Sequence, residues 1–175
     1  MIVSLIGMPG SGKSTIGRQL ARRLKVSFFD SDQFIEGRIG CSIRQYFEMQ
    51  GEARFRDIEE EALEELSSLP NGILATGGGA VLRLANREHL RERSRVVYLK
   101  SSPEELFRRL RHDRNRPLLQ VSDPMARLAE LYAERDPLYQ QTAHYVFETG
   151  RPSVAMLVNM IQTQLELSGA KPGLT

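Results

Sequence analysis

The stretch Gly7-Met8-Pro9-Gly10-Ser11-Gly12-Lys13-Ser14-Thr15 decides the fold of this chain. It matches the P-loop pattern G-x-x-x-x-G-K-[ST] and lies between an apolar run at residues 2–6 and a helical pattern at residues 13–24. Its glycines allow a tight turn in which successive backbone N–H groups point at phosphate oxygens, and the helix dipole adds positive potential. Lys13 supplies a mobile positive charge, and the hydroxyl of Ser14 is a ligand for Mg²⁺. The stretch therefore predicts a site for a nucleoside triphosphate.

Composition places the chain among globular proteins, with 175 residues of which 41% are hydrophobic and 26% charged. We expect one domain over residues 1–168 and a C-terminal tail over residues 169–175. The net charge of +2 does not indicate a nucleic-acid surface, and no apolar run approaches the length of a membrane span. We expect no signal peptide, because an apolar strand pattern and the P-loop begin at once, and the single Cys41 cannot form an internal disulfide. We therefore expect a cytoplasmic monomer that binds neither nucleic acid nor a membrane.

Apolar runs alternate with helical patterns along the chain, which is typical of a parallel sheet with helices on both faces. The patterns predict strands at residues 2–6, 26–29, 73–76, 95–99 and 145–147. They predict helices at residues 13–24, 31–38, 43–50, 52–67, 87–93, 103–111, 124–143 and 153–167. The predicted fold class is α/β, a three-layer α/β/α sandwich with a five-stranded parallel sheet.

Polar residues near the helix ends refine these boundaries. Ser42 opens a capping box, Ser102 precedes a proline at the first helical position, and Asn86 could cap the helix that follows it. Within residues 52–67, a run of glutamates that includes Glu59 is expected to form a solvated face.

Residues 112–123 are the longest irregular stretch, and they lie between two predicted helices. Loops of this length in compact domains are usually functional or mobile, so we interpret the stretch as a mobile lid. Arg116 lies in this lid and Arg135 in the helix after it. Either guanidinium could clamp a phosphate or a carboxylate, or do neither.

Several candidate groups follow the predicted strands, at the ends where ligands bind in open parallel sheets: the P-loop, Asp30 with Asp32, Gly77-Gly78-Gly79, and Arg151-Pro152. On an extended backbone, the side chains of Asp30 and Asp32 would point to the same side. One carboxylate could lie near Mg²⁺ while the other accepts the proton of a hydroxyl substrate. The alternative is that one of them merely caps the next helix.

The triple glycine and a nearby arginine remain ambiguous from the residues alone. Gly77-Gly78-Gly79 would let a ligand approach the backbone and its N–H donors, but it could also be a plain flexible turn. Arg56 could bind a ligand or could pair on the surface with an acidic neighbour, and the spacing does not decide between the two.

Together these motifs resemble the shikimate kinase family, within the nucleoside-monophosphate-kinase-like P-loop proteins, over about residues 2–165. The P-loop is shared with a vast superfamily, whereas the other motifs are specific as a set. Those motifs are Phe28-Phe29-Asp30-Ser31-Asp32, Gly51-Glu52-x-x-Phe55-Arg56-x-x-Glu59, Thr76-Gly77-Gly78-Gly79-Ala80-Val81, Arg116-Pro117-Leu118-Leu119 and Arg135-x-x-x-Tyr139. The resemblance implies a fold of the P-loop kinase type.

The resemblance also implies transfer of a phosphoryl group from ATP to the 3-hydroxyl of shikimate, a step toward chorismate and the aromatic amino acids, with Mg²⁺ as cofactor. The implied catalytic residues are Lys13, Asp32 and Arg116. The implied ATP-binding residues are Gly10, Ser11, Gly12, Lys13, Ser14, Thr15, Arg109, Arg116, Arg151 and Pro152. The implied shikimate-binding residues are Asp32, Arg56, Gly77, Gly78, Gly79 and Arg135, and the implied metal ligands are Ser14 and Asp30.

Three other functions remain open from the sequence. A gluconate kinase on the same fold would also need a pocket for an acidic sugar. A nucleoside monophosphate kinase would respond to AMP or CMP. A non-catalytic ATP-binding module would bind the nucleotide without phosphorylating any acid, although the intact set of Lys13, Asp30, Asp32 and Arg116 argues against it.

Overall fold

The computed structural model describes residues 1–111 and 121–169, and the structural statements below concern these residues. The strands are β1 (Ile2–Ile6), β2 (Phe28–Asp30), β3 (Gly72–Ala75), β4 (Ser94–Lys100) and β5 (Tyr145–Glu148). The helices are α1 (Lys13–Leu24), α2 (Ser31–Ile39), α3 (Ile43–Gln50), α4 (Glu52–Ser67), α5 (Leu84–Arg93), α6 (Pro103–Leu110), α7 (Pro124–Thr142) and α8 (Val154–Leu167). Most of the predicted lid at residues 112–123, and most of the predicted tail, lie outside the described residues.

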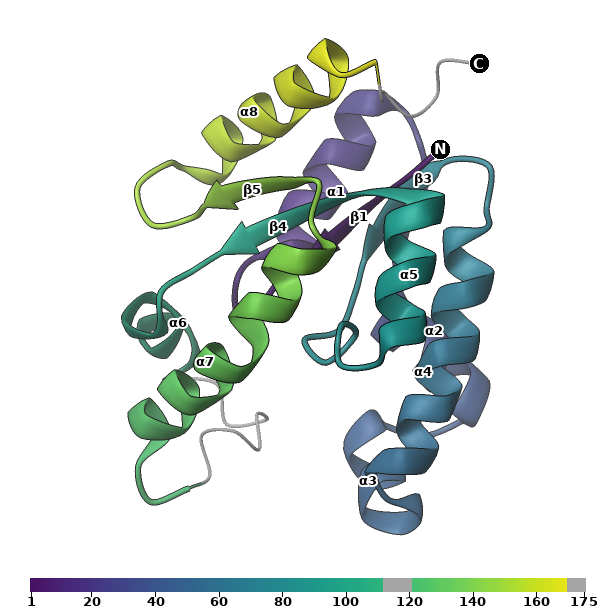
Figure 1. Ribbon diagram of the computed structural model, residues 1–175, viewed down its shortest axis with the longest axis vertical. Coiled ribbons are helices and arrows are strands. Elements are labelled where there is room, and N and C mark those ends of the chain that lie inside the picture. The colour runs from purple at the N-terminus through teal and green to yellow at the C-terminus, as the bar shows by residue number, and fades with distance from the viewer. Residues whose placement is uncertain (112–120, 170–175) are drawn as a thin grey trace.

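All five strands pair in parallel, in the order β2-β3-β1-β4-β5 (Figure 1). β1 is the central strand, and its Ile2 lies opposite Gly72 of β3 on one side and Ser94 of β4 on the other. The chain adds strands on one side of β1 and then on the other, so the strand order reverses at β1. Ligands of doubly wound sheets bind at such a point, beyond the carboxyl end of the strand. The predicted α/β fold with a five-stranded parallel sheet is confirmed.

Helices cover both faces of the sheet and form two main cores (Figure 1). Val3 and Leu5 of β1 pack with α1 and α8, whereas Ile2 and Ile6 pack with α4, α5, α6 and α7. All four side chains are fully buried, as expected for a strand that is covered on both faces. A third, smaller cluster joins α2, α3 and α4 around the buried ring of Phe55. The three predicted layers are therefore present.

Local hydrogen bonds explain where the helices begin and end. The hydroxyl of Ser42 accepts the N–H of Gln45, whose side chain returns to the N–H of Ser42, so the predicted capping box is confirmed. Ser102 caps α6 as predicted, by accepting an N–H of the first turn at 3.2 Å. The interpretation of Asn86 as a cap is wrong, because α5 begins two residues earlier and Asn86 lies fully buried inside it.

The second strand starts later than predicted, and the end of α1 provides the reason. Lys25 takes a left-handed conformation with φ of 56°, and the N–H of Val26 still bonds back to the carbonyl of Ala21. Because Val26 completes the turn that ends α1, extended pairing begins only at Phe28. The predicted strand at residues 26–29 is therefore displaced to Phe28–Asp30.

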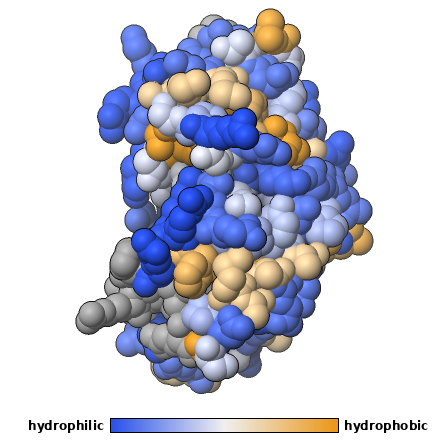
Figure 2. All heavy atoms as spheres, turned by 90° about the vertical axis from the view of Figure 1, so that its left-hand side faces the viewer, coloured by the Kyte–Doolittle hydropathy of each residue, from blue (hydrophilic) through white to orange (hydrophobic). Residues whose placement is uncertain are grey.

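The outer surface gives little sign of an apolar partner on the side that Figure 2 draws. Hydrophilic residues dominate this side, and apolar residues gather there in separate groups. Within residues 1–111 and 121–169, no helix combines the length and the apolar character that crossing a membrane requires.

Candidate functional site

A cavity of about 530 Å³ opens beyond the carboxyl ends of the central strands, where the sequence predicts a ligand site. Its wall combines segments that follow all five strands. The residues that line it are Pro9, Gly10, Ser11, Gly12, Lys13, Ser14, Thr15, Ile16, Asp30, Asp32, Thr76, Gly77, Gly78, Arg109, Thr149, Pro152, Val154 and Leu157. The cavity therefore brings together most of the predicted site residues.

The P-loop has the geometry of a phosphate cradle. Gly10 and Gly12 hold φ values of 86° and 96°, a conformation in which an L side chain is strained. Gly12 caps α1 without a side-chain hydrogen bond, which leaves N–H groups of the first turn available to an anion. Lys13 is 9% exposed, and its Nζ donates to the carbonyls of Gly7 at 2.6 Å and Met8 at 3.0 Å. The ammonium is thus held within the loop, at the cavity wall.

Ser14 and Asp30 form a pair of oxygen donors suited to Mg²⁺. The hydroxyl of Ser14 lies 3.0 Å from Oδ2 of Asp30, and both residues line the cavity. Oδ1 of Asp30 accepts the N–H groups of Asp32 and Gln33, which caps α2 and fixes the carboxylate. Mg²⁺ is usually bound by one or two protein oxygens together with substrate phosphates and water, so the pair fits this ion. Among the described residues, no group of three or more Asp, Glu, His or Cys side chains is arranged so that it could hold a metal ion.

Asp32 does not lie on an extended backbone, which corrects the spacing argument for the two carboxylates. β2 ends at Asp30, and Asp32 belongs to the first turn of α2. The capping interpretation of Asp30 therefore holds, whereas its other oxygen lies near Ser14 at the cavity and its role in the site stays a prediction. Asp32 still reaches the cavity, because the helix turns it toward Gly77.

The surroundings of Asp32 stabilise the protonated, neutral carboxyl group relative to the same group in water. Burial, and then the negative charges of Asp30 and Glu59, raise the pKa of Asp32 from 3.8 to about 6, against the opposing charge of Lys13. A carboxylate whose pKa lies near the working pH is well matched to accepting a proton. Asp32 therefore has the protonation behaviour of a general base.

Each glycine of the segment Gly77-Gly78-Gly79, here called the glycine strip, lies against a different charged or polar group. A Cβ on Gly77 would lie 2.7 Å from Oδ1 of Asp32. A Cβ on Gly78 would lie 3.2 Å from Nη1 of Arg135, and one on Gly79 would lie 2.6 Å from Cζ of Arg56. The absence of side chains therefore lets three functional groups from α2, α4 and α7 converge on one stretch of backbone.

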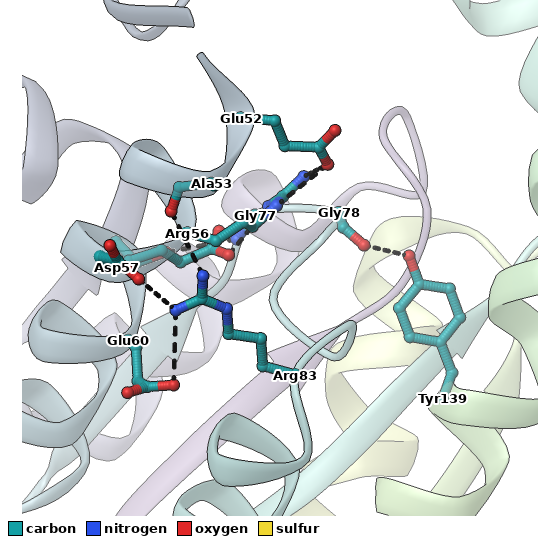
Figure 3. A network of polar contacts seen from close by, with 11 residues as sticks. Glu52, Ala53, Arg56, Asp57, Glu60, Gly77, Gly78, Arg83 and Tyr139 are labelled. Carbon is teal, nitrogen blue, oxygen red and sulfur yellow. Dashed lines mark hydrogen bonds and ion pairs between the residues drawn. The ribbon is translucent and has the colours of Figure 1, made fainter. Parts of the chain in front are cut away.

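A buried carboxylate holds the guanidinium of Arg56 in place. Its Nη1 lies 2.8 Å from Oε1 of Glu59, which is 1% exposed, and its guanidinium also lies near the rings of Phe47 and Phe55. Glu52 makes a longer, exposed contact at 3.4 Å (Figure 3). The pKa of Glu59 is raised by burial, with Arg56 opposing the shift. The alternative in which Arg56 pairs with an acidic neighbour on the surface therefore describes only its contact with Glu52. Its shorter contact is with the buried Glu59.

Glu59 is the functional residue that the sequence interpretation placed wrongly, in a solvated acidic face. The spacing of Glu59 relative to the apolar residues of this helix could have indicated that it is buried. Phe55, Glu59, Ala62 and Leu66 recur at intervals of three and four residues and form the buried side of α4. An acidic residue on an apolar helical face needs a buried partner, and Arg56 one turn earlier provides it.

Arg135 and Tyr139 approach the glycine strip from α7. The hydroxyl of Tyr139 donates to the carbonyl of Gly78 at 2.5 Å (Figure 3), and its ring packs on that of Tyr98. Burial raises the pKa of Tyr139, so the hydroxyl keeps its proton for this bond. Nε of Arg135 is buried and has no hydrogen-bond partner among the described residues. A buried donor of this kind suits an anionic ligand at the strip.

Three residues implied to bind nucleotide lie at or beside the cavity, and the structure separates them. Arg109 and Pro152 line the main cavity, and Nη1 of Arg109 donates to the carbonyl of Gly10 at 3.1 Å. Arg151 instead lines a neighbouring cavity of about 510 Å³, which Pro152 also borders. Arg116 lies outside the described residues, so its role stays a prediction.

Comparisons with known proteins agree with the site. The family model described as shikimate kinase matches residues 9–166. A shikimate kinase from Paracidovorax citrulli (strain AAC00-1) is 58% identical, over 97% of this chain and 94% of the relative. The structure of a shikimate kinase from Acinetobacter baumannii in complex with shikimate is 45% identical with a TM-score of 0.90, over 96% of this chain and 93% of that one.

A gluconokinase structure from Sinorhizobium meliloti 1021 is 18% identical with a TM-score of 0.56, over 95% of this chain and 91% of that one, and it shares the fold alone. The shikimate kinase model, in contrast, covers the glycine strip and Arg135 as well as the P-loop from Pro9 onward. The relative from Paracidovorax is more than half identical over nearly the whole of both chains. This chain belongs to the shikimate kinase family.

Proposed function

We propose that the chain transfers the γ-phosphoryl group of ATP to the 3-hydroxyl of shikimate, with Mg²⁺ as cofactor, within the cavity between the P-loop and the glycine strip. Family membership makes the chain a phosphotransferase that acts on an alcohol group. One observation carries the residue assignment: Asp32, Arg56 and Arg135 converge on the glycine strip, whose first two residues line the cavity that Lys13 also lines.

The donor half of the site consists of the P-loop and the residues around it. Backbone N–H groups of the loop and Lys13 bind the phosphates, while Arg109 and Pro152 flank the adenine. Ser14 and Asp30 hold Mg²⁺, which neutralises charge on the phosphate oxygens when it is bound. Arg116 and Arg151 are also assigned here. We propose that Arg116 reaches the phosphates when the lid closes, which excludes water.

The acceptor half consists of the glycine strip and the side chains against it. Arg56, fixed by Glu59, and Arg135, with its free Nε, grip the carboxylate of shikimate. The strip lines the pocket for the ring and lets the ring approach the backbone closely. Asp32 orients the reacting hydroxyl and accepts its proton. Since phosphoryl transfer passes through a loose transition state, positioning and charge stabilisation supply most of the acceleration.

A coupled assay of ADP release tests the proposal, with shikimate and gluconate supplied side by side. We expect turnover with shikimate and none with gluconate. Turnover with gluconate alone would identify a gluconate kinase, and stimulation by AMP or CMP a nucleoside monophosphate kinase. ATP binding without turnover on any acid would identify a non-catalytic module, so each alternative has its own outcome.

Replacement of Arg135 by alanine tests the carboxylate contact. We expect the KM for shikimate to rise by about 10- to 100-fold, because losing hydrogen bonds to a charged group costs about 1.5–3 kcal/mol. The KM for ATP should change much less. Steady-state kinetics with each substrate varied in turn measures both.

Arg127→Ala is the matched control, because Arg127 lies on the same helix, is 43% exposed and pairs only with Glu130 in the salt bridges of the described residues. It should leave both KM values unchanged. An unchanged shikimate KM in Arg135→Ala would remove Arg135 from the carboxylate site.

The raised pKa of Asp32 predicts how the rate depends on pH. The ionised carboxylate is the form that accepts a proton, and the pKa of Asp32 is about 6 in the free protein. We therefore expect kcat/KM for shikimate to fall about tenfold for each pH unit below about 6 and to level off above it. A rate profile over pH 4.5–8.5 in saturating ATP measures this. A profile that stays flat from pH 7 to pH 5 would contradict the assignment.

We also propose that residues 1–168 act as one kinase domain, because the described strands form a single sheet and the cavity draws on segments along its whole length. Cytoplasmic location and the monomeric state remain predictions from the sequence. Gel filtration with light scattering tests the second.

A further inference from the structure

A buried carboxylate lies behind the nucleotide end of the cavity and is not among the residues assigned so far. Glu105, in the first turn of α6, is 8% exposed. Its Oε2 lies 2.7 Å from Nη2 of Arg109 and accepts the hydroxyl of Thr149 at 2.6 Å. A buried acidic residue is costly to maintain without close partners, and Oε2 of Glu105 has two of them.

The contacts of Glu105 join four segments of the chain. Arg109 also donates to the carbonyl of Gly10, so one guanidinium links α6 to the P-loop. Thr149, just after β5, is hydrogen-bonded to Ser101, just after β4. Gly150 follows with no side chain, and a Cβ there would lie 2.9 Å from Oε1 of Glu105. The carboxylate therefore packs closely against the segment after β5 as well as against α6, and the residue also lines the neighbouring cavity of about 510 Å³.

The way Arg109 is held determines what it offers to the cavity. Its two terminal nitrogens bond to different segments, Nη1 to the P-loop and Nη2 to Glu105. Hydrogen bonds of a guanidinium lie in its plane, so both bonds hold the group by its edge and occupy neither of its flat faces. Arg109 lines the cavity and is 39% exposed in its side chain. A fixed, partly exposed guanidinium face is a surface on which an aromatic base stacks.

We propose that Glu105 is a positioning residue of the nucleotide site, which holds the guanidinium of Arg109 by its edge so that its face meets the adenine ring opposite Pro152. Glu105 does not line the main cavity and acts only through Arg109. The proposal rests on the proposed function in one respect, the placement of adenine at this end of the cavity.

Glu105→Gln tests the proposal, because it keeps the shape of the side chain and removes the charge that fixes Arg109. By titration calorimetry, we expect ADP to bind about 5- to 20-fold more weakly, with a similar rise in the KM for ATP. The KM for shikimate and kcat at saturation should stay within about twofold of the parent values. Glu104→Gln is the matched control, since Glu104 is an exposed neighbour on the same helix, and it should change none of these quantities.

Inorganic tripolyphosphate separates positioning from a general loss of structure. This competitor carries the phosphates without a base, so its inhibition constant against ATP should be unchanged in Glu105→Gln. The proposal is overturned if Glu105→Gln weakens the binding of tripolyphosphate as much as the binding of ADP. It is also overturned if ADP binding is unchanged. The calorimetry needs no turnover, so failure of the shikimate assay would not be mistaken for failure of this inference.

Two further variants keep the proposal testable if Glu105→Gln folds poorly. Gly150→Ala crowds Oε1 of Glu105 without removing a charge, and it should weaken ADP but not tripolyphosphate. In an Arg109→Ala background, Glu105→Gln should have no further effect on ADP binding, because the two residues act as one unit. Additive losses in the double variant would show that Glu105 does not act through Arg109.

Discussion

Replacing Lys13 by alanine is expected to lower kcat by on the order of 10³-fold or more, the range seen when a charge that stabilises a transferring phosphoryl group is lost. Lys13 is 9% exposed, and two carbonyls of the P-loop hold its ammonium at the cavity wall. A charge placed in advance needs no reorganisation during the reaction, so its removal affects the transition state most. Single-turnover measurements with saturating ATP and shikimate give the loss in the chemical step.

Two companion variants make the result for Lys13 specific. Lys13→Met keeps the apolar stem and should lose as much activity as Lys13→Ala, which excludes a packing effect. Arg22→Ala removes a cation from an exposed position on the same helix and should leave kcat unchanged. More than about a tenth of the parent kcat in both Lys13 variants would contradict a catalytic role.

Asp32→Asn is expected to lower kcat by about 10²- to 10⁴-fold, the usual contribution of a positioned general base. A loss near the lower limit would mean that Asp32 chiefly orients the hydroxyl, since a loose transition state needs little help with proton removal. The acidic limb of the pH–rate profile should disappear in this variant. Retention of that limb would assign it to another group.

The same substitution is expected to stabilise the fold above pH 6. The pKa of Asp32 is about 6 in the folded chain and 3.8 in the reference state, so the folded state binds the proton more tightly. Stability due to this group is therefore greatest at low pH and is lost as the pH rises from about 4 to about 6. Asn cannot ionise, so the gain in Tm over the parent should be larger at pH 8 than at pH 5. Glu48→Gln, at an exposed position on α3, controls for the change in net charge.

The sequence was sufficient to predict the order of the strands and helices and the position of the P-loop between them, because these depend on short-range patterns. The P-loop pattern at Gly7–Thr15 itself implies a strand, a tight loop and a helix, and the capping box at Ser42 involves residues close together in the sequence. The convergence of Arg56 and Arg135 on the glycine strip could not be predicted from short-range patterns. These residues come from different helices, and only the tertiary fold brings them to the same backbone.

The two errors have different origins. The acidic neighbours of Glu59 predict a solvated face, whereas the fold buries this residue against Arg56. The spacing argument for Asp32 assumes an extended backbone, whereas Asp30 caps α2 through the backbone N–H groups of Asp32 and Gln33. A tertiary contact outweighs the local pattern at Glu59, and a local cap does so at Asp32.

The glycine strip has a consequence for how acceptor specificity changes in evolution. A Cβ on Gly77 would meet Asp32, one on Gly78 would meet Pro9 and then Arg135, and one on Gly79 would meet Arg56, so a side chain gained at each position displaces a different group. A compensating change must then occur on another helix, far away in sequence. We therefore expect a change of acceptor to need paired substitutions, one in the glycine strip and one in the side chain against it.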